Sequence, residues 1–245
     1  MANWSDPRSG VAGYGNATTA RGEAFDAGLR RYMLSVYNYM ASGVLLTGIV
    51  ALLFASSGLA YQVLAGPGIL KYIIMFAPLA FVMVLSFGIN RLSTVTAQAL
   101  YWAYAAVMGL SLSSIFLVYT GTSIAQTFFA TAAAFAGLSL WGYTTKKDLS
   151  GFGTFLIMGV VGLLVASLIN LFLRSSAMDL VISFLGVLLF AGLTAYDTQK
   201  IKSIYAHVAG TDMMGKSVIM GALNLYLDFI NMFLFLLRFM GGSRD

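Results

Sequence analysis

Seven long apolar segments, separated by short polar stretches, dominate the chain. Each is close to the roughly 20 residues that an α-helix needs to cross a bilayer core of about 30 Å. Because lipid offers no hydrogen-bond partner to exposed backbone amides, a compact bundle of helices is the architecture that suits such segments. We therefore predict an all-α membrane protein with seven transmembrane helices. The predicted spans cover residues 36–60, 70–90, 97–119, 124–143, 153–173, 178–197 and 217–239.

The residues before the first span divide into two predicted parts. Residues 1–20 are rich in small and polar side chains and contain no apolar run, which predicts a disordered tail. In residues 21–35, Phe25 and Leu29 recur at helical spacing and charged side chains lie off their stripe, which predicts an amphipathic arm at the membrane interface. Residues 36–240 then form the predicted transmembrane domain.

The composition supports a membrane protein and excludes several kinds of functional site. Only 9% of the residues are charged and 59% are hydrophobic, and the mean hydropathy is +0.85. A soluble domain has roughly 25% charged residues, so these values also indicate a membrane protein. The chain has no cysteine and a single histidine, His207, which excludes disulfides, thiol catalysis and a zinc site built on histidines. We predict no cofactor.

The basic residues predict the orientation in the membrane. The net charge of +5 would suggest nucleic-acid binding in a soluble protein, but here the basic residues lie in short loops, so we expect none. With seven spans, ten of the 14 basic residues fall on the side of the N-terminus and four on the other side, which predicts a cytoplasmic N-terminus. If the last segment were re-entrant instead, twelve basic residues would share the N-terminal side and two the other. We favour seven spans, because residues 215–240 are long enough to cross and contain no proline.

Two acidic residues lie inside or at the end of apolar runs. Asp197 follows an uncharged run from Leu180 to Tyr196, and Asp228 lies in the middle of the last span. The cost of a carboxylate at the bilayer centre is about 2.5 to 3.5 kcal/mol on insertion scales, so Asp228 should face the interior of the bundle and find a partner or a proton. The midpoint of the two positions falls in the turn near Asp212. In an antiparallel helix pair the two carboxyl groups would therefore lie at similar depth and share a proton, provided that the sixth helix continues past Asp197 to about His207.

Asp197 and Arg91 also have simpler interpretations. Asp197 can be an interfacial side chain that pairs with Lys200, three residues later. Arg91, which closes the second span, can extend its side chain to the membrane surface or serve as a counter-ion to the acidic pair. The residues alone leave these alternatives open.

Two motifs carry a resemblance to a known family. They are FAGLTAYDTQKI at residues 190–201 and NLYLDFIN at residues 224–231. With them the sequence resembles bacterial members of the Bax inhibitor-1 family, also called the transmembrane Bax inhibitor motif family, over about residues 25–240. The resemblance implies two helix triplets wrapped around a central C-terminal helix. It also implies a pH-sensitive calcium leak in which Asp197 and Asp228 are sensor and gate and Arg91 is a latch.

The expected function combines the two acids with what the resemblance implies. We expect a calcium leak channel in the bacterial inner membrane, gated by a proton-sharing aspartate pair, with Asp197 and Asp228 as transient ligands of the permeant Ca²⁺. The expected partners are the lipid bilayer, Ca²⁺ and H⁺, with other membrane proteins as further candidates. The alternative is a non-conducting regulator that binds membrane proteins such as a quality-control protease through its first 30 residues. We do not expect an enzyme, because Leu225, Tyr226 and Leu227 stand where intramembrane aspartyl proteases have a Gly-x-Gly-Asp pattern.

Overall fold

The computed structural model describes residues 11–242, with side chains from Gly22 onward. The described chain is helical, and seven of its helices are long and apolar enough to cross a membrane, which confirms the predicted all-α membrane fold. The long helices are α1 (Val11–Ser56), α2 (Leu70–Gly88), α3 (Thr94–Leu112), α5 (Gly121–Thr144), α6 (Ser150–Leu173), α7 (Ser176–Val208) and α8 (Met213–Met240). A short π-helix (Tyr61–Ala65) precedes α2, and the four-residue α4 (Ile115–Val118) follows α3.

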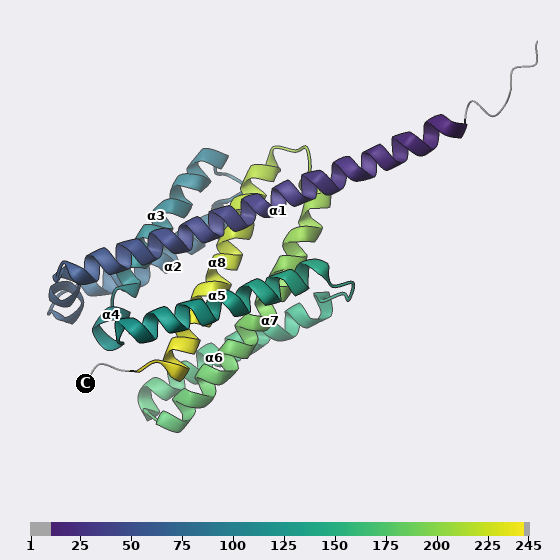
Figure 1. The fold of residues 1–245 in the computed structure, drawn as a ribbon. Coiled ribbons are helices and arrows are strands. Elements are labelled where there is room, and N and C mark those ends of the chain that lie inside the picture. Colours follow the sequence, from purple (N-terminus) through teal and green to yellow (C-terminus); the bar gives the residue numbers. More distant parts are fainter. Residues whose placement is uncertain (1–10, 243–245) are drawn as a thin grey trace, which may run out of the picture.

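Helix α1 is much longer than one span. Its 46 residues correspond to about 69 Å, more than twice the hydrocarbon core, and Figure 1 shows its N-terminal part projecting beyond the bundle. The helix begins at Val11, so the predicted division at residue 20 between a tail and an arm does not separate two elements. Extending an existing helix costs little compared with starting one, and residues 11–35 contain no proline. Residues 1–10 of the predicted tail lie outside the described residues.

Helix α8 occupies the centre of the bundle (Figure 1). In its most apolar 18-residue window 67% of the residues are buried, against 11–33% in the other six spans. It packs against α1, α3, α5 and α7. With 28 residues in one unbroken helix, α8 is about 42 Å long, so it has the length of a full span rather than of a re-entrant loop.

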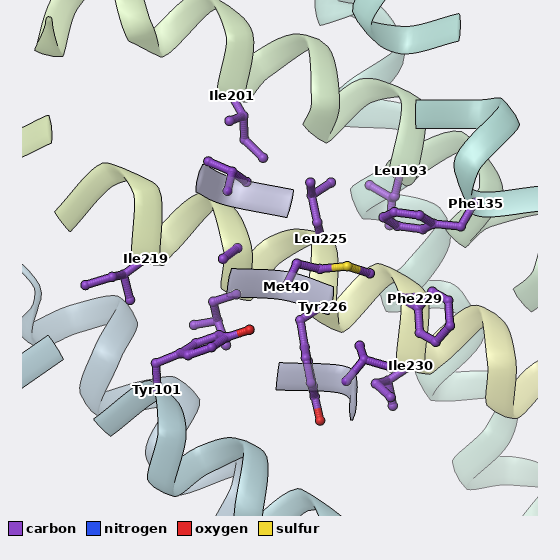
Figure 2. Close-up of a cluster of buried hydrophobic side chains, with 14 of the residues drawn as sticks. Met40, Tyr101, Phe135, Leu193, Ile201, Ile219, Leu225, Tyr226, Phe229 and Ile230 are labelled. Atoms are coloured by element: carbon purple, nitrogen blue, oxygen red, sulfur yellow. The ribbon is translucent and has the colours of Figure 1, made fainter. Parts of the chain in front are cut away.

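The core follows from this central position. Figure 2 shows side chains of α8, including Leu225, Tyr226 and Phe229, surrounded by buried residues from α1, α3, α5 and α7. By contrast, many large apolar side chains of α6 are exposed, among them Phe172 at 84%. That distribution is expected where lipid, and not water, contacts the outer surface.

Close approaches between helices occur at glycines. Ala132 and Ala136, which are four residues apart on α5, line an open groove instead. An added Cβ at Gly142 of α5 would collide with the carbonyl oxygen of Ala195 in α7. At Gly186 of α7 it would meet the ring of Phe235 in α8. The tight contacts therefore connect α7 to both of these neighbours.

Candidate functional site

Asp228 lies on the most buried part of the central helix. It is 4% exposed, and its neighbours Tyr226, Phe229 and Ile230 are buried as well. Residues 222–240 contain no glycine or proline, so the helix carries the carboxyl group into the core without a break. A buried carboxyl group in such a place requires a hydrogen-bonding partner.

Asp197 supplies that partner from α7. This helix continues past Asp197 to Val208, as the sequence argument requires, and a short turn with Gly210 in the left-handed conformation (φ 75°) returns the chain into α8. The resulting antiparallel pair brings the side chains of Asp197 and Asp228 within hydrogen-bonding reach of each other. The predicted juxtaposition of the two acids is therefore present in the structure.

The two carboxyl groups can form a hydrogen bond with each other only if one of them carries a proton. The Oδ2 atom of Asp228 is buried and has no hydrogen-bond partner among the described residues. Two carboxylates can only accept hydrogen bonds, whereas a carboxylic acid beside a carboxylate donates one. One shared proton thus removes a negative charge and supplies the missing donor. The arrangement can therefore hold or release one proton.

Lys200 lies near Asp197 but does not form the simple ion pair considered above. Its charge acts on Asp197, yet no oxygen of Asp197 lies within 4.0 Å of a basic nitrogen in the described chain. The Nζ atom of Lys200 instead lies 5.8 Å from the centre of the Tyr196 ring. Asp197 is consequently left to interact with Asp228.

Arg91 does not form an ion pair with Asp197 or Asp228. It is exposed in the turn between α2 and α3, where its backbone N–H donates to the Gly88 carbonyl at 2.8 Å. No carboxylate of the described residues lies within ion-pair distance of its guanidinium group. The expected latch is absent from this conformation, and its role in another conformation stays a prediction.

Among the described residues, no His, Cys, Asp or Glu side chain joins the two aspartates as a third metal ligand. The described chain contains no group of three or more His, Cys, Asp or Glu side chains that could hold a metal ion. Calcium takes six to eight oxygen ligands, so a carboxyl pair alone is a weak and transient site. The predicted calcium contact at this pair therefore stays a prediction.

A chain of hydroxyl groups next to the aspartates was not predicted from the sequence. Thr198 donates to the Thr194 carbonyl at 2.8 Å, so its oxygen accepts from Ser139 at 2.8 Å, and Ser139 in turn accepts from Tyr37 at 2.6 Å. The chain connects α1 and α5 to α7 at the residue after Asp197. Isolated hydroxyl residues in apolar segments were its only signal in the sequence, and such residues usually bond within their own helix.

Comparison with known proteins shows the family of the chain. Residues 29–245 match the family described as inhibitor of apoptosis-promoting Bax1. The chain belongs to the Bax inhibitor family. The match includes both aspartates and every span from the buried part of α1 onward.

Bacterial relatives of this Bax inhibitor family member cover nearly its whole length. It is 50% identical over 229 residues to the uncharacterized protein RP147 of Rickettsia prowazekii, covering 93% of this chain and 96% of the relative. It is 47% identical over 220 residues to the inner membrane protein YbhL of Escherichia coli K12, covering 89% and 94% of the two chains. A third relative, YrjE of Lactococcus lactis, is 38% identical over 223 residues and covers 89% and 94%.

Proposed function

We propose that this protein is a pH-sensitive calcium leak channel of the bacterial inner membrane, with its N-terminus in the cytoplasm. The observation that carries the proposal is the pair of carboxyl groups, Asp197 on α7 and Asp228 on the central helix α8, within hydrogen-bonding reach of each other. Intramembrane acids of this kind are functional candidates by default, since burying them costs stability. The inner-membrane assignment is supported by the similarity to YbhL, an inner membrane protein of Escherichia coli.

The pair supports gating because its charge depends on one proton. Two full negative charges about 4 Å apart repel by about 4 kcal/mol at an effective dielectric constant of 20. That energy is comparable to the free-energy differences that hold proteins in one of two packed states. A change in proton number therefore alters the packing of α7 against α8. Asp228 is only 4% exposed, so conduction requires such a rearrangement.

The same carboxyl groups support a cation as the permeant species. Deprotonated carboxylates are ligands that Ca²⁺ prefers, and two of them without a complete coordination shell bind it weakly enough to release it. In the proposed cycle Arg91 approaches Asp197 when that carboxylate is charged and leaves when it is neutral. The basic residues Lys200 and Lys202 follow Asp197 on α7 and lie toward the predicted cytoplasmic end.

Calcium flux into vesicles tests the proposal. The purified protein is reconstituted into calcium-free liposomes that contain a fluorescent calcium indicator, and entry is followed at several pH values. We expect entry that depends on pH, and Asp228→Asn should abolish this dependence. Asp179→Asn is the matched control, because Asp179 lies at the other end of the bundle, half exposed and paired with Arg238. Absence of flux, or an unchanged pH profile in Asp228→Asn, would rule the channel out.

The length of α1 favours a second candidate function. The described helix begins at Val11, and residues 22–27 are all exposed, so about one additional span length of helix projects from the bundle. A projecting helix is suited to contact another membrane protein, such as a quality-control protease. Deleting residues 1–20 should abolish the effect on such a partner and leave calcium flux unchanged. If deletion changes flux but not the partner effect, this second function is wrong.

A further inference from the structure

A groove lies between α1 and α5, and neither aspartate lines it. It has a volume of about 770 Å³. Its walls are apolar side chains of α1 and α5, among them Met33, Leu45 and Ala136, and Phe135 and Phe229 form its floor. Both helices are predicted spans, so the open side of the groove faces the bilayer. Figure 1 shows α1 and α5 running alongside each other in this part of the bundle.

Apart from Arg30 at one end, the polar side chains in the groove already have hydrogen-bond partners. The hydroxyl of Tyr37 donates to Ser139, and the hydroxyl of Ser139 donates to Thr198, so both are committed to the chain of hydrogen bonds described above. An occupant therefore meets a surface without free donors along most of its length. Such a surface does not favour a polar solute or a file of water, because their hydrogen bonds would be lost.

The groove has the length of a lipid chain. Its lining extends from Arg30 to Leu45 on α1 and from Phe128 to Tyr143 on α5, about 22 Å along each helix. One leaflet of the hydrocarbon core is about 15 Å thick, so the groove accommodates a whole acyl chain of one leaflet.

One end of the groove is positively charged. As the first and fourth spans, α1 and α5 run in opposite directions, and the hydrogen bond between Tyr37 and Ser139 sets their register, so Arg30 and Tyr143 lie at the same end. Arg30 is exposed, and no carboxylate of the described residues lies within ion-pair distance of it. Lys202 reaches the same end, where its Nζ donates to the Tyr143 carbonyl at 2.8 Å. Arginine binds phosphate with two parallel hydrogen bonds, so this end suits an anionic headgroup.

We propose that the groove between α1 and α5 binds one anionic phospholipid, with an acyl chain along Leu34, Ala136 and Phe229 and its phosphate at Arg30. The proposal does not depend on the calcium leak. The lipid completes the packing of α1 against α5, whose only described side-chain hydrogen bond is that of Tyr37 with Ser139. Because Phe229 follows Asp228 directly, the bound acyl chain also contacts the turn of helix α8 that carries the buried Asp228.

Native mass spectrometry tests this proposal on the full-length protein. The protein is solubilised with a mixture of phosphatidylglycerol and phosphatidylethanolamine, and the lipid adducts that survive detergent removal are counted. We expect one retained phosphatidylglycerol per chain. Ala136→Trp, which fills the groove, should reduce retention at least tenfold. The matched control is Ala134→Trp on the same helix, because Ala134 is exposed and does not line the groove; it should retain the lipid.

A second variant tests the headgroup. Arg30→Gln should abolish the preference for phosphatidylglycerol over phosphatidylethanolamine while one acyl chain remains bound. Thermal unfolding of each variant verifies that it is folded. Equal loss of lipid in Ala134→Trp and Ala136→Trp, or no preferential retention in the unmodified protein, would show ordinary surrounding lipid only and overturn the proposal.

Cross-linking tests the competing occupant, a second copy of the chain. The protein has no cysteine, so Ala136→Cys introduces a single thiol into the groove. We expect no disulfide-linked dimer in liposomes, because a lipid chain covers this position. Ala134→Cys is the control. Efficient dimer formation by Ala136→Cys, but not by Ala134→Cys, would show that a second protein occupies the groove and would contradict the proposal.

Discussion

Gly142 of α5 packs directly against the backbone of Ala195 in α7, two residues before Asp197, and leaves no room for a side chain between the two helices. This contact fixes the distance of α7 from α5 at the level of the aspartate pair. It also explains why a glycine stands within a helix, where glycine costs about 1 kcal/mol relative to alanine.

Gly142→Ala should therefore destabilise the protein although alanine is the better helix former. The new methyl group would collide with the Ala195 carbonyl, and overpacking of this kind costs about 1 to 3 kcal/mol. Gly137→Ala in the same helix is the control, because nothing lies within 4 Å of its added Cβ. Unfolding by SDS, followed by circular dichroism, measures both variants. Equal stability of the two would contradict the importance of the close approach.

The Thr47 side chain connects three helices. Its hydroxyl donates to the Ala105 carbonyl of α3 at 2.8 Å and therefore accepts from the Tyr226 hydroxyl of α8 at 2.7 Å. Tyr226→Phe removes one hydrogen bond and should cost about 0.6 to 1.5 kcal/mol. Thr47→Val should cost more, because it leaves the buried Tyr226 hydroxyl and the Ala105 carbonyl without that partner. In a double-mutant cycle the two costs should add up to more than the cost of the double variant; strict additivity would argue against the bond.

Gln199 attaches the loop between α5 and α6 to α7. Its side chain accepts from the Leu149 N–H and donates to the Lys147 carbonyl, each at 2.8 Å. Gln199→Ala should raise the hydrogen-exchange rate of residues 145–149 several-fold, since exchange requires local opening. Ser203→Ala is the control, because the Ser203 hydroxyl bonds only to the Lys200 carbonyl of its own helix. Similar exchange in both variants would show that the loop is held by other contacts.

Asp148 in this loop has a measurable titration outside the membrane spans. The hydroxyl and backbone N–H of Ser150 hydrogen-bond its carboxylate and hold the pKa of Asp148 below its usual value. A lowered pKa in the folded state means that the contact contributes stability above the unfolded pKa and loses it as the pH falls through the folded value. Ser150→Ala should raise the pKa of Asp148 toward normal, as measured by NMR. An unchanged pKa would assign the shift to the backbone N–H alone.

The sequence was sufficient to predict the helices and the relationship of the two acids along them. Long apolar segments have few alternatives to membrane helices, and the symmetric positions of Asp197 and Asp228 about a turn place them at similar depth in any antiparallel pair. Both expectations agree with the structure. The first residue of α1 and the position of Arg91 could not be predicted as well from the sequence, because helix extension and turn geometry depend on neighbouring chain segments.

Which side of each helix faces its neighbours was decided only by the tertiary structure. A membrane helix is apolar nearly all round, so the hydrophobic pattern does not say which face is turned inward. Close packing made that choice: Gly142 against Ala195 sets α5 on α7, and the buried face of α8 turns Asp228 toward Asp197. The groove between α1 and α5 arises where such a contact is missing, and the sequence therefore contained no direct sign of it.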